Sequence, residues 1–181
     1  MKTLLLTVKL LIWGYLSYLL VFLGTSYHPE NAAYSPPFLL FVIDTINLFV
    51  HEAGHFFFKL FGQWVYVMGG SMFQVLLPLA LVIVTWRQNV GQIGFPAFWM
   101  GESMVNVSVY IRDAPYKKLH LIARGLIHDW NWLLSGNFEA AEPLGDVVFG
   151  LGILVCSAAV AFGVYFAIQT FRSGRPFQIP E

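Results

Sequence analysis

Charged residues are scarce in this chain: they make up 11% of its 181 residues, against about 25% in an average soluble domain. Ten basic and ten acidic residues leave a formal net charge of zero, so the composition offers no basic patch for nucleic acid. So few charges cannot cover the surface of a soluble domain, and the high apolar content excludes a disordered chain. Cys156 is the only cysteine, which excludes an internal disulfide.

Apolar residues are correspondingly abundant, at 57% of the sequence, and the mean hydropathy is +0.66. A membrane-spanning helix needs about 20 mostly apolar residues. Five segments meet or approach this requirement: 4–23, 38–61, 71–86, 95–111 and 144–171. We therefore predict an all-α fold, a polytopic transmembrane bundle of about five spans that forms a single domain over residues 1–181. Because no small-residue cleavage site follows residues 4–23, we expect an uncleaved first helix; the alternative is a cleaved signal peptide.

The basic residues predict an orientation, since they collect on the cytoplasmic side of a membrane protein. With the N-terminus inside, the cytoplasmic side receives Lys2, Lys9, Lys59, Arg112, Lys117, Lys118 and Arg124. The outer side then receives Arg87, Arg172 and Arg175. This N-in/C-out topology makes the loop 112–143 cytoplasmic, and we expect residues 116–126 to form an interfacial amphipathic helix. The expected location is a bacterial plasma membrane, as an integral multi-pass protein.

A metal-binding motif stands inside the second predicted span. His51-Glu52-Ala53-Gly54-His55 is an HExxH sequence, and on a helix its two histidines lie one turn apart on the same face. Two imidazoles so placed can bind one zinc ion, while Glu52 can take a proton from the attacking water. The alternative is a pair of hydrogen-bonded core histidines. An acidic side chain within a span is costly, and this favours the functional interpretation.

A catalytic zinc site takes three protein ligands, so a third must come from elsewhere. The predicted cytoplasmic loop contains His128-Asp129-Trp130-Asn131-Trp132. Asp129 is our first choice and His128 the second; the alternative is an interfacial segment in which tryptophans lie at the headgroup level. Glu102, in the fourth span, is a weaker candidate.

Two further polar residues precede the motif on the same helix face. Asp44 and Asn47 lie seven and four residues before His51. They could hydrogen-bond a metal-ligating histidine and orient its ring. Equally, they could hydrogen-bond to neighbouring helices.

The motif resembles that of the site-2 protease family of intramembrane zinc metalloproteases. The resemblance rests on His51 to Phe56, HEAGHF, followed by Lys59-Leu60-Phe61-Gly62, Gly69-Gly70, Gln74 and Pro78. It implies zinc held by His51 and His55, Glu52 as general base, and hydrolysis of a peptide bond in a membrane-embedded substrate. The family's Asn-Pro-Asp-Gly motif, which supplies its third ligand, is absent from this sequence.

These observations predict a membrane metallopeptidase with one Zn²⁺ per chain, acting on a membrane protein or peptide in the lipid bilayer. Two other functions stay open. A non-catalytic membrane subunit or chaperone could hold a structural metal with four protein ligands. A metal or proton transporter could use the intramembrane polar residues as a relay.

Overall fold

The computed structural model describes residues 2–119 and 127–173, and every regular element in these ranges is helical. This confirms the all-α prediction for the described part of the chain. The α-helices are α1 (Lys2–Thr25), α2 (Phe38–Phe58), α3 (Gln63–Gln88), α4 (Gly94–Arg112), α5 (Asp129–Leu133) and α6 (Ala141–Ser173). Three short 3₁₀ segments accompany them: η1 (Lys59–Phe61), η2 (Val90–Gln92) and η3 (Phe138–Ala140).

Three of these helices are long and apolar enough to cross a membrane. They are α1, α3 and the continuous segment Phe138–Ser173, which contains η3 and α6. The helices α2 and α4 form where the second and fourth spans are predicted but are not among the three, because each carries polar side chains such as Asp44 and Glu102. The five-span count and the N-in/C-out orientation stay predictions.

Local sequence explains where the helices begin and end. Pro37 precedes α2, in keeping with the tolerance of proline at a helix start. Gly62 has φ +91°, a conformation that favours glycine, and it turns the chain from η1 into α3. The connection predicted over residues 62–70 was too long, because Gly69 and Gly70 are already helical.

The loop before α6 also differs from expectation. Residues 116–119, the start of the predicted amphipathic helix, lie in a turn and irregular backbone. Residues 120–126 of that prediction lie outside the described residues. The described part of the loop contains the short helix α5, which carries Asp129 as its first residue.

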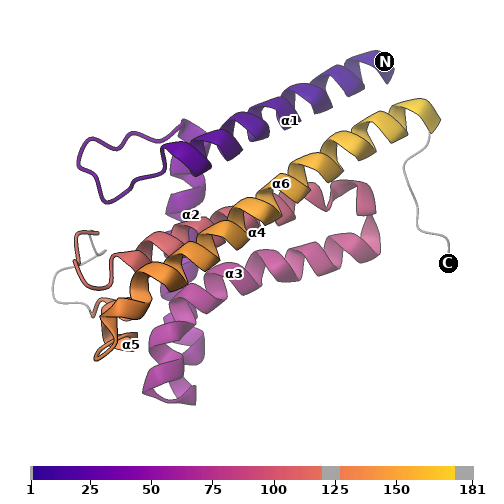
Figure 1. Ribbon diagram of the computed structural model, residues 1–181. Helices are drawn as coiled ribbons and strands as arrows, with labels where there is room; N and C mark the ends of the chain where they lie inside the picture. Colours follow the sequence, from indigo (N-terminus) through magenta and orange to yellow (C-terminus); the bar gives the residue numbers. More distant parts are fainter. Residues whose placement is uncertain (1, 120–126, 174–181) are drawn as a thin grey trace.

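The long helices run along a common direction, with α1 and α4 opposite in chain sense to α3 and α6 (Figure 1). Near the end of this bundle where α5 lies, α2 crosses them steeply (Figure 1). The interior is filled by side chains of α1, α4 and α6, among them Trp13, Leu19, Phe98 and Cys156. Large apolar side chains also cover the outside, as with Leu5 and Val21 of α1, which is how a lipid-facing surface is built.

Glycines allow a close helix contact between α4 and α6. A Cβ built on Gly152 would lie 2.7 Å from the carbonyl oxygen of Gly101 and 2.9 Å from a methyl group of Val105. Small residues of this kind let helix backbones approach in membranes, where packing drives association. The nearby Gly150 has no atom within 4 Å of the same built position.

These two glycines give a matched test of the α4–α6 contact. We expect Gly152→Ala to lower the free energy of unfolding by about 1–3 kcal/mol, because the added methyl group overpacks the interface. Gly150→Ala should leave stability unchanged or raise it by up to about 1 kcal/mol through helix propensity. Thermal unfolding of both variants in the same detergent measures the difference. Equal effects of the two substitutions would contradict the packing described here.

Candidate metal centre

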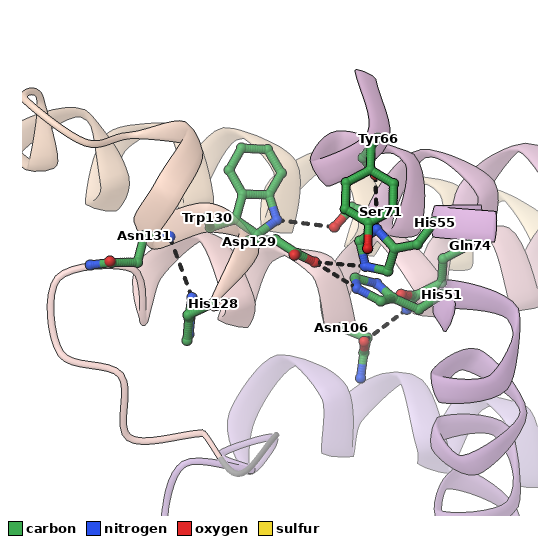
Figure 2. Close-up of polar contacts among 10 residues, drawn as sticks. All are labelled: His51, His55, Tyr66, Ser71, Gln74, Asn106, His128, Asp129, Trp130 and Asn131. Atoms are coloured by element: carbon green, nitrogen blue, oxygen red, sulfur yellow. Dashed lines mark hydrogen bonds and ion pairs between the residues drawn. The ribbon is translucent and has the colours of Figure 1, made fainter. Parts of the chain in front are cut away.

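Three potential metal ligands converge from two distant parts of the chain. His51 and His55 stand one turn apart on α2, and Asp129 comes from α5 (Figure 2). Asp129 Oδ2 lies 2.8 Å from Nε2 of His51 and 3.2 Å from Nε2 of His55. The described part of the chain holds this one group of three or more His, Cys, Asp or Glu side chains with metal-binding spacing.

The spacing of the three ligand atoms suits a small metal ion. All three lie within 4.8 Å of one another. Ligands at about 2.0–2.1 Å from a tetrahedral zinc are separated by about 3.3 Å. The set of two imidazole nitrogens and one carboxylate oxygen is one that zinc accepts, and it leaves a fourth position open.

The hydrogen bonds of His55 also fit a bound cation. Its Nδ1 lies 2.8 Å from the carbonyl oxygen of Tyr66, and a carbonyl only accepts, so Nδ1 carries a hydrogen. In the neutral imidazole Nε2 then has a lone pair, which faces the oxygen of Asp129. Two lone pairs repel unless a cation lies between them or the ring takes a second proton. A metal ion meets this requirement, and the Tyr66 carbonyl fixes the tautomer that binds it.

Close backbone packing places the histidines against α3. A Cβ on Gly70 would lie 2.5 Å from Nε2 of His51, so the imidazole occupies the space that a side chain would fill. One turn further along α2, Gly54 contacts the Gly69 carbonyl directly. The His51 ring stacks on Tyr110, with centroids 5.9 Å apart. Any larger residue at Gly70 would displace the imidazole.

The short helix α5 is held by contacts on both sides of Asp129. His128 is its N-cap, and Nδ1 of that ring accepts the backbone N–H of Asn131. Trp130 donates its indole N–H to Ser71 of α3 at 3.0 Å. The Asn131 side-chain amide donates to the carbonyl of Ala114. These contacts fix α5 so that the carboxylate of Asp129 points at the imidazoles (Figure 2).

His128, the second choice for the third ligand, lies outside the metal-binding group. Its side chain points away from the two imidazoles (Figure 2), and its Nε2 lies 3.1 Å from Asp113 Oδ2. Both side chains are almost fully buried. With Nδ1 accepting and Nε2 donating, both ring nitrogens have partners in one neutral tautomer. The structure therefore gives His128 a positioning role for α5.

The carboxyl group of Asp129 is suited to bind a cation. Burial disfavours its ionised form, but hydrogen bonds and the charge interaction with His51 and His55 outweigh this effect and lower the pKa of Asp129. The group is therefore ionised at neutral pH, the state in which a carboxylate binds metals.

Glu52 stands beside His51 in the same helical turn. Its side chain is half-buried, and it makes no hydrogen bond or ion pair with the described residues. A carboxylate without a structural partner is free to accept a proton from a substrate or a water.

The other sequence candidates lie together in a different place. Asn47 donates to Glu102 Oε2 at 2.7 Å, and Asp44 accepts from Tyr27 at 2.6 Å. Among the described residues neither Asp44 nor Asn47 hydrogen-bonds to His51 or His55. Asp44 and Asn47 therefore make hydrogen bonds to a neighbouring helix, as the second interpretation expects. Glu102 does not belong to the group of potential metal ligands.

Sequence reasoning missed several groups that shape this site. The Tyr66 carbonyl, Tyr110 and Asp113 carry no motif, and their roles depend on how helices meet. Gly69-Gly70 is the one signal that could have been used, because paired glycines inside an apolar helix indicate a close backbone approach.

No protein-family model matches this chain, and no curated protein or solved structure matches it either. Membership of the site-2 protease family is thus an inference from the motif alone. The geometry of His51, His55 and Asp129 stands independently of that inference.

Substitutions at neighbouring positions separate Asp129 from His128 as the third ligand. Asp129→Ala should lower zinc affinity more than about 100-fold, exceeding the 10–100-fold typical of groups that only orient ligands. His128→Asn keeps a side chain that can cap α5 and should lower affinity less than about 10-fold. Calorimetric titration of metal-free protein with Zn²⁺ measures both. A larger loss for His128→Asn than for Asp129→Ala would make His128 the ligand.

Proposed function

We propose that this protein is a zinc-dependent membrane peptidase that hydrolyses a peptide bond of a membrane-associated protein or peptide. The observation that carries the proposal is the convergence of Asp129 on His51 and His55, beside Glu52, which has no hydrogen-bond or ion-pair partner among the described residues. Two histidines at i and i+4, a carboxylate ligand and an adjacent free carboxylate are the side chains that metal-assisted hydrolysis needs. The HEAGHF sequence makes the site-2 protease family the proposed relative.

The number of ligands favours a catalytic over a structural site. Structural zinc sites are closed by four protein ligands, whereas catalytic ones keep a position for water or substrate. In the described residues the group has three members. His128, which precedes Asp129 in the chain, is paired with Asp113. An open position is thus the expected state of this site.

The metal ion and the protein side chains have different roles in the proposed reaction. Zinc, when bound by His51, His55 and Asp129, would polarise the scissile carbonyl and lower the pKa of water near it. Glu52 then accepts the proton of the attacking water and returns it to the leaving amine as the C–N bond breaks. The Tyr66 carbonyl keeps the His55 ring in one orientation throughout.

The surroundings of the site favour an apolar substrate. The helix end and corner that follow His55 expose large apolar side chains, including Phe56 at 79% and Leu60 at 91%. Further exposed aromatic residues there are Phe57, Phe61 and Trp64. Such a surface fits contact with lipid or with a hydrophobic segment of another membrane protein. A substrate segment at or within the bilayer is therefore the proposed class.

Glu52→Gln tests the proposed role of Glu52. The substitution removes the base but no metal ligand, so zinc content should stay at one per chain while cleavage falls at least about 100-fold. The assay is mass spectrometry of a defined mixture of synthetic single-span apolar peptides, reconstituted with the full-length protein in lipid vesicles. Glu142→Gln, an exposed glutamate on α6, is the matched control and should cleave like the wild type.

Metal removal gives a second readout of the same proposal. A chelator should abolish cleavage, and added Zn²⁺ should restore it, because three protein groups remain to rebind the ion. Purified wild-type protein that binds no zinc would refute the proposal. So would cleavage by Glu52→Gln at the wild-type rate.

A further inference from the structure

Two carboxyl groups meet in the interior of the bundle, away from the metal ligands. Asp44 of α2 and Glu102 of α4 lie close enough for their side chains to interact. Glu102 is fully buried. In the described part of the chain no Lys, Arg or His forms an ion pair with either group. The titratable groups that interact electrostatically with one or both members of the pair are Tyr27, Tyr34, Tyr110 and Cys156. All four are neutral when protonated.

Two amide side chains are oriented as donors to this pair. Asn47 Oδ1 accepts from Trp99 and Ser103, so its Nδ2 faces Glu102 Oε2 at 2.7 Å. Asn106 Oδ1 accepts from Gln74, so its Nδ2 faces Asp44 Oδ1 at 3.1 Å.

A third donor, the hydroxyl of Tyr27, also reaches Asp44 Oδ1, at 2.6 Å. Because these donors point at the carboxyl oxygens, the site is built for a negative charge.

One hydrogen atom is nevertheless missing from the hydrogen bonds around this pair. Glu102 Oε1 is buried and has no donor. An ionised carboxylate can only accept a hydrogen bond, so Asp44 and Glu102 can hydrogen-bond to each other only if one of them carries a proton. Two adjacent negative charges in an apolar interior would also repel strongly. One proton between the groups removes both difficulties.

We propose that Asp44 and Glu102 form an intramembrane proton-binding site in which one proton resides on Glu102 Oε1 and is donated to the carboxylate of Asp44. The assignment follows from the donors: Asp44 receives two hydrogen bonds and Glu102 one. The group with more donors is the better anion. The pair then carries one negative charge, which the amides and Tyr27 stabilise.

Tyr27 lies between the pair and a cavity at the end of the bundle. A cavity of about 620 Å³ is lined by residues of α1, α4 and α6 and by Tyr27. Tyr27 thus borders the cavity and donates its hydroxyl to Asp44. This series of hydroxyl and carboxyl groups is the path along which the proposed site would exchange its proton with the cavity.

Infrared spectroscopy of the full-length, metal-free protein in lipid tests this proposal. At neutral pH the wild type should show the carbonyl band of a protonated carboxylic acid, and the band should shift when water is replaced by D₂O. Glu102→Gln should lose the band completely, because glutamine replaces the protonated acid with an amide of the same shape. Asp129→Asn and His51→Ala, which alter the metal site, should keep it.

Asp44→Asn provides a second variant should Glu102→Gln fail to fold. It should keep the band at a shifted position, because Glu102 retains its proton but loses its carboxylate acceptor. Absence of the band in the wild type would overturn the proposal. A band that appears only after Na⁺ is removed would make the pair a sodium site instead. A band that survives Glu102→Gln would place the proton elsewhere.

Discussion

Polar side chains among apolar helices need hydrogen-bond partners. This requirement shapes the structure around the group of His51, His55 and Asp129 and around the pair of Asp44 and Glu102. Water is absent from the bilayer core, so an unsatisfied donor or acceptor there costs several kcal/mol. In the described part of the chain only Tyr34 Oη and Glu102 Oε1 are buried side-chain atoms without a hydrogen-bond partner. The crossing of α2 over the bundle lets its polar residues reach α3, α4 and α5 at once.

As a consequence, the two halves of α2 contact different parts of the structure. Its first half contributes Asp44 and Asn47 to the contacts with α4. Its second half presents His51 and His55 to α5. Asp129 reaches them because α5 is held by two buried contacts: the Asp113–His128 pair and the Trp130–Ser71 hydrogen bond. The geometry of the group formed by His51, His55 and Asp129 thus depends on residues outside that group.

The part of this site that sequence could predict is the part encoded within one helix. The i, i+4 spacing of His51 and His55 fixes their relation without tertiary information. The sequence does not decide between Asp129 and His128 as the third ligand. Adjacent residues point in different directions, and the way α5 packs on the other helices determines which of them faces the imidazoles. Asp44 and Asn47 share a face with His51, yet the steep crossing of α2 directs them to α4. Helix positions follow from hydropathy. The predicted spans leave Gly69-Gly70 in a connection although both are helical, because glycine allows both a turn and close helix packing.

X-ray absorption at the zinc edge of the wild-type protein tests the central claim most directly. The account predicts one zinc per chain with two imidazole nitrogens at about 2.0–2.1 Å and only oxygen in the remaining positions. That pattern corresponds to His51, His55, Asp129 and an open site. A third imidazole would show that His128 or another histidine completes the coordination, and protein without bound zinc would contradict the metal centre altogether.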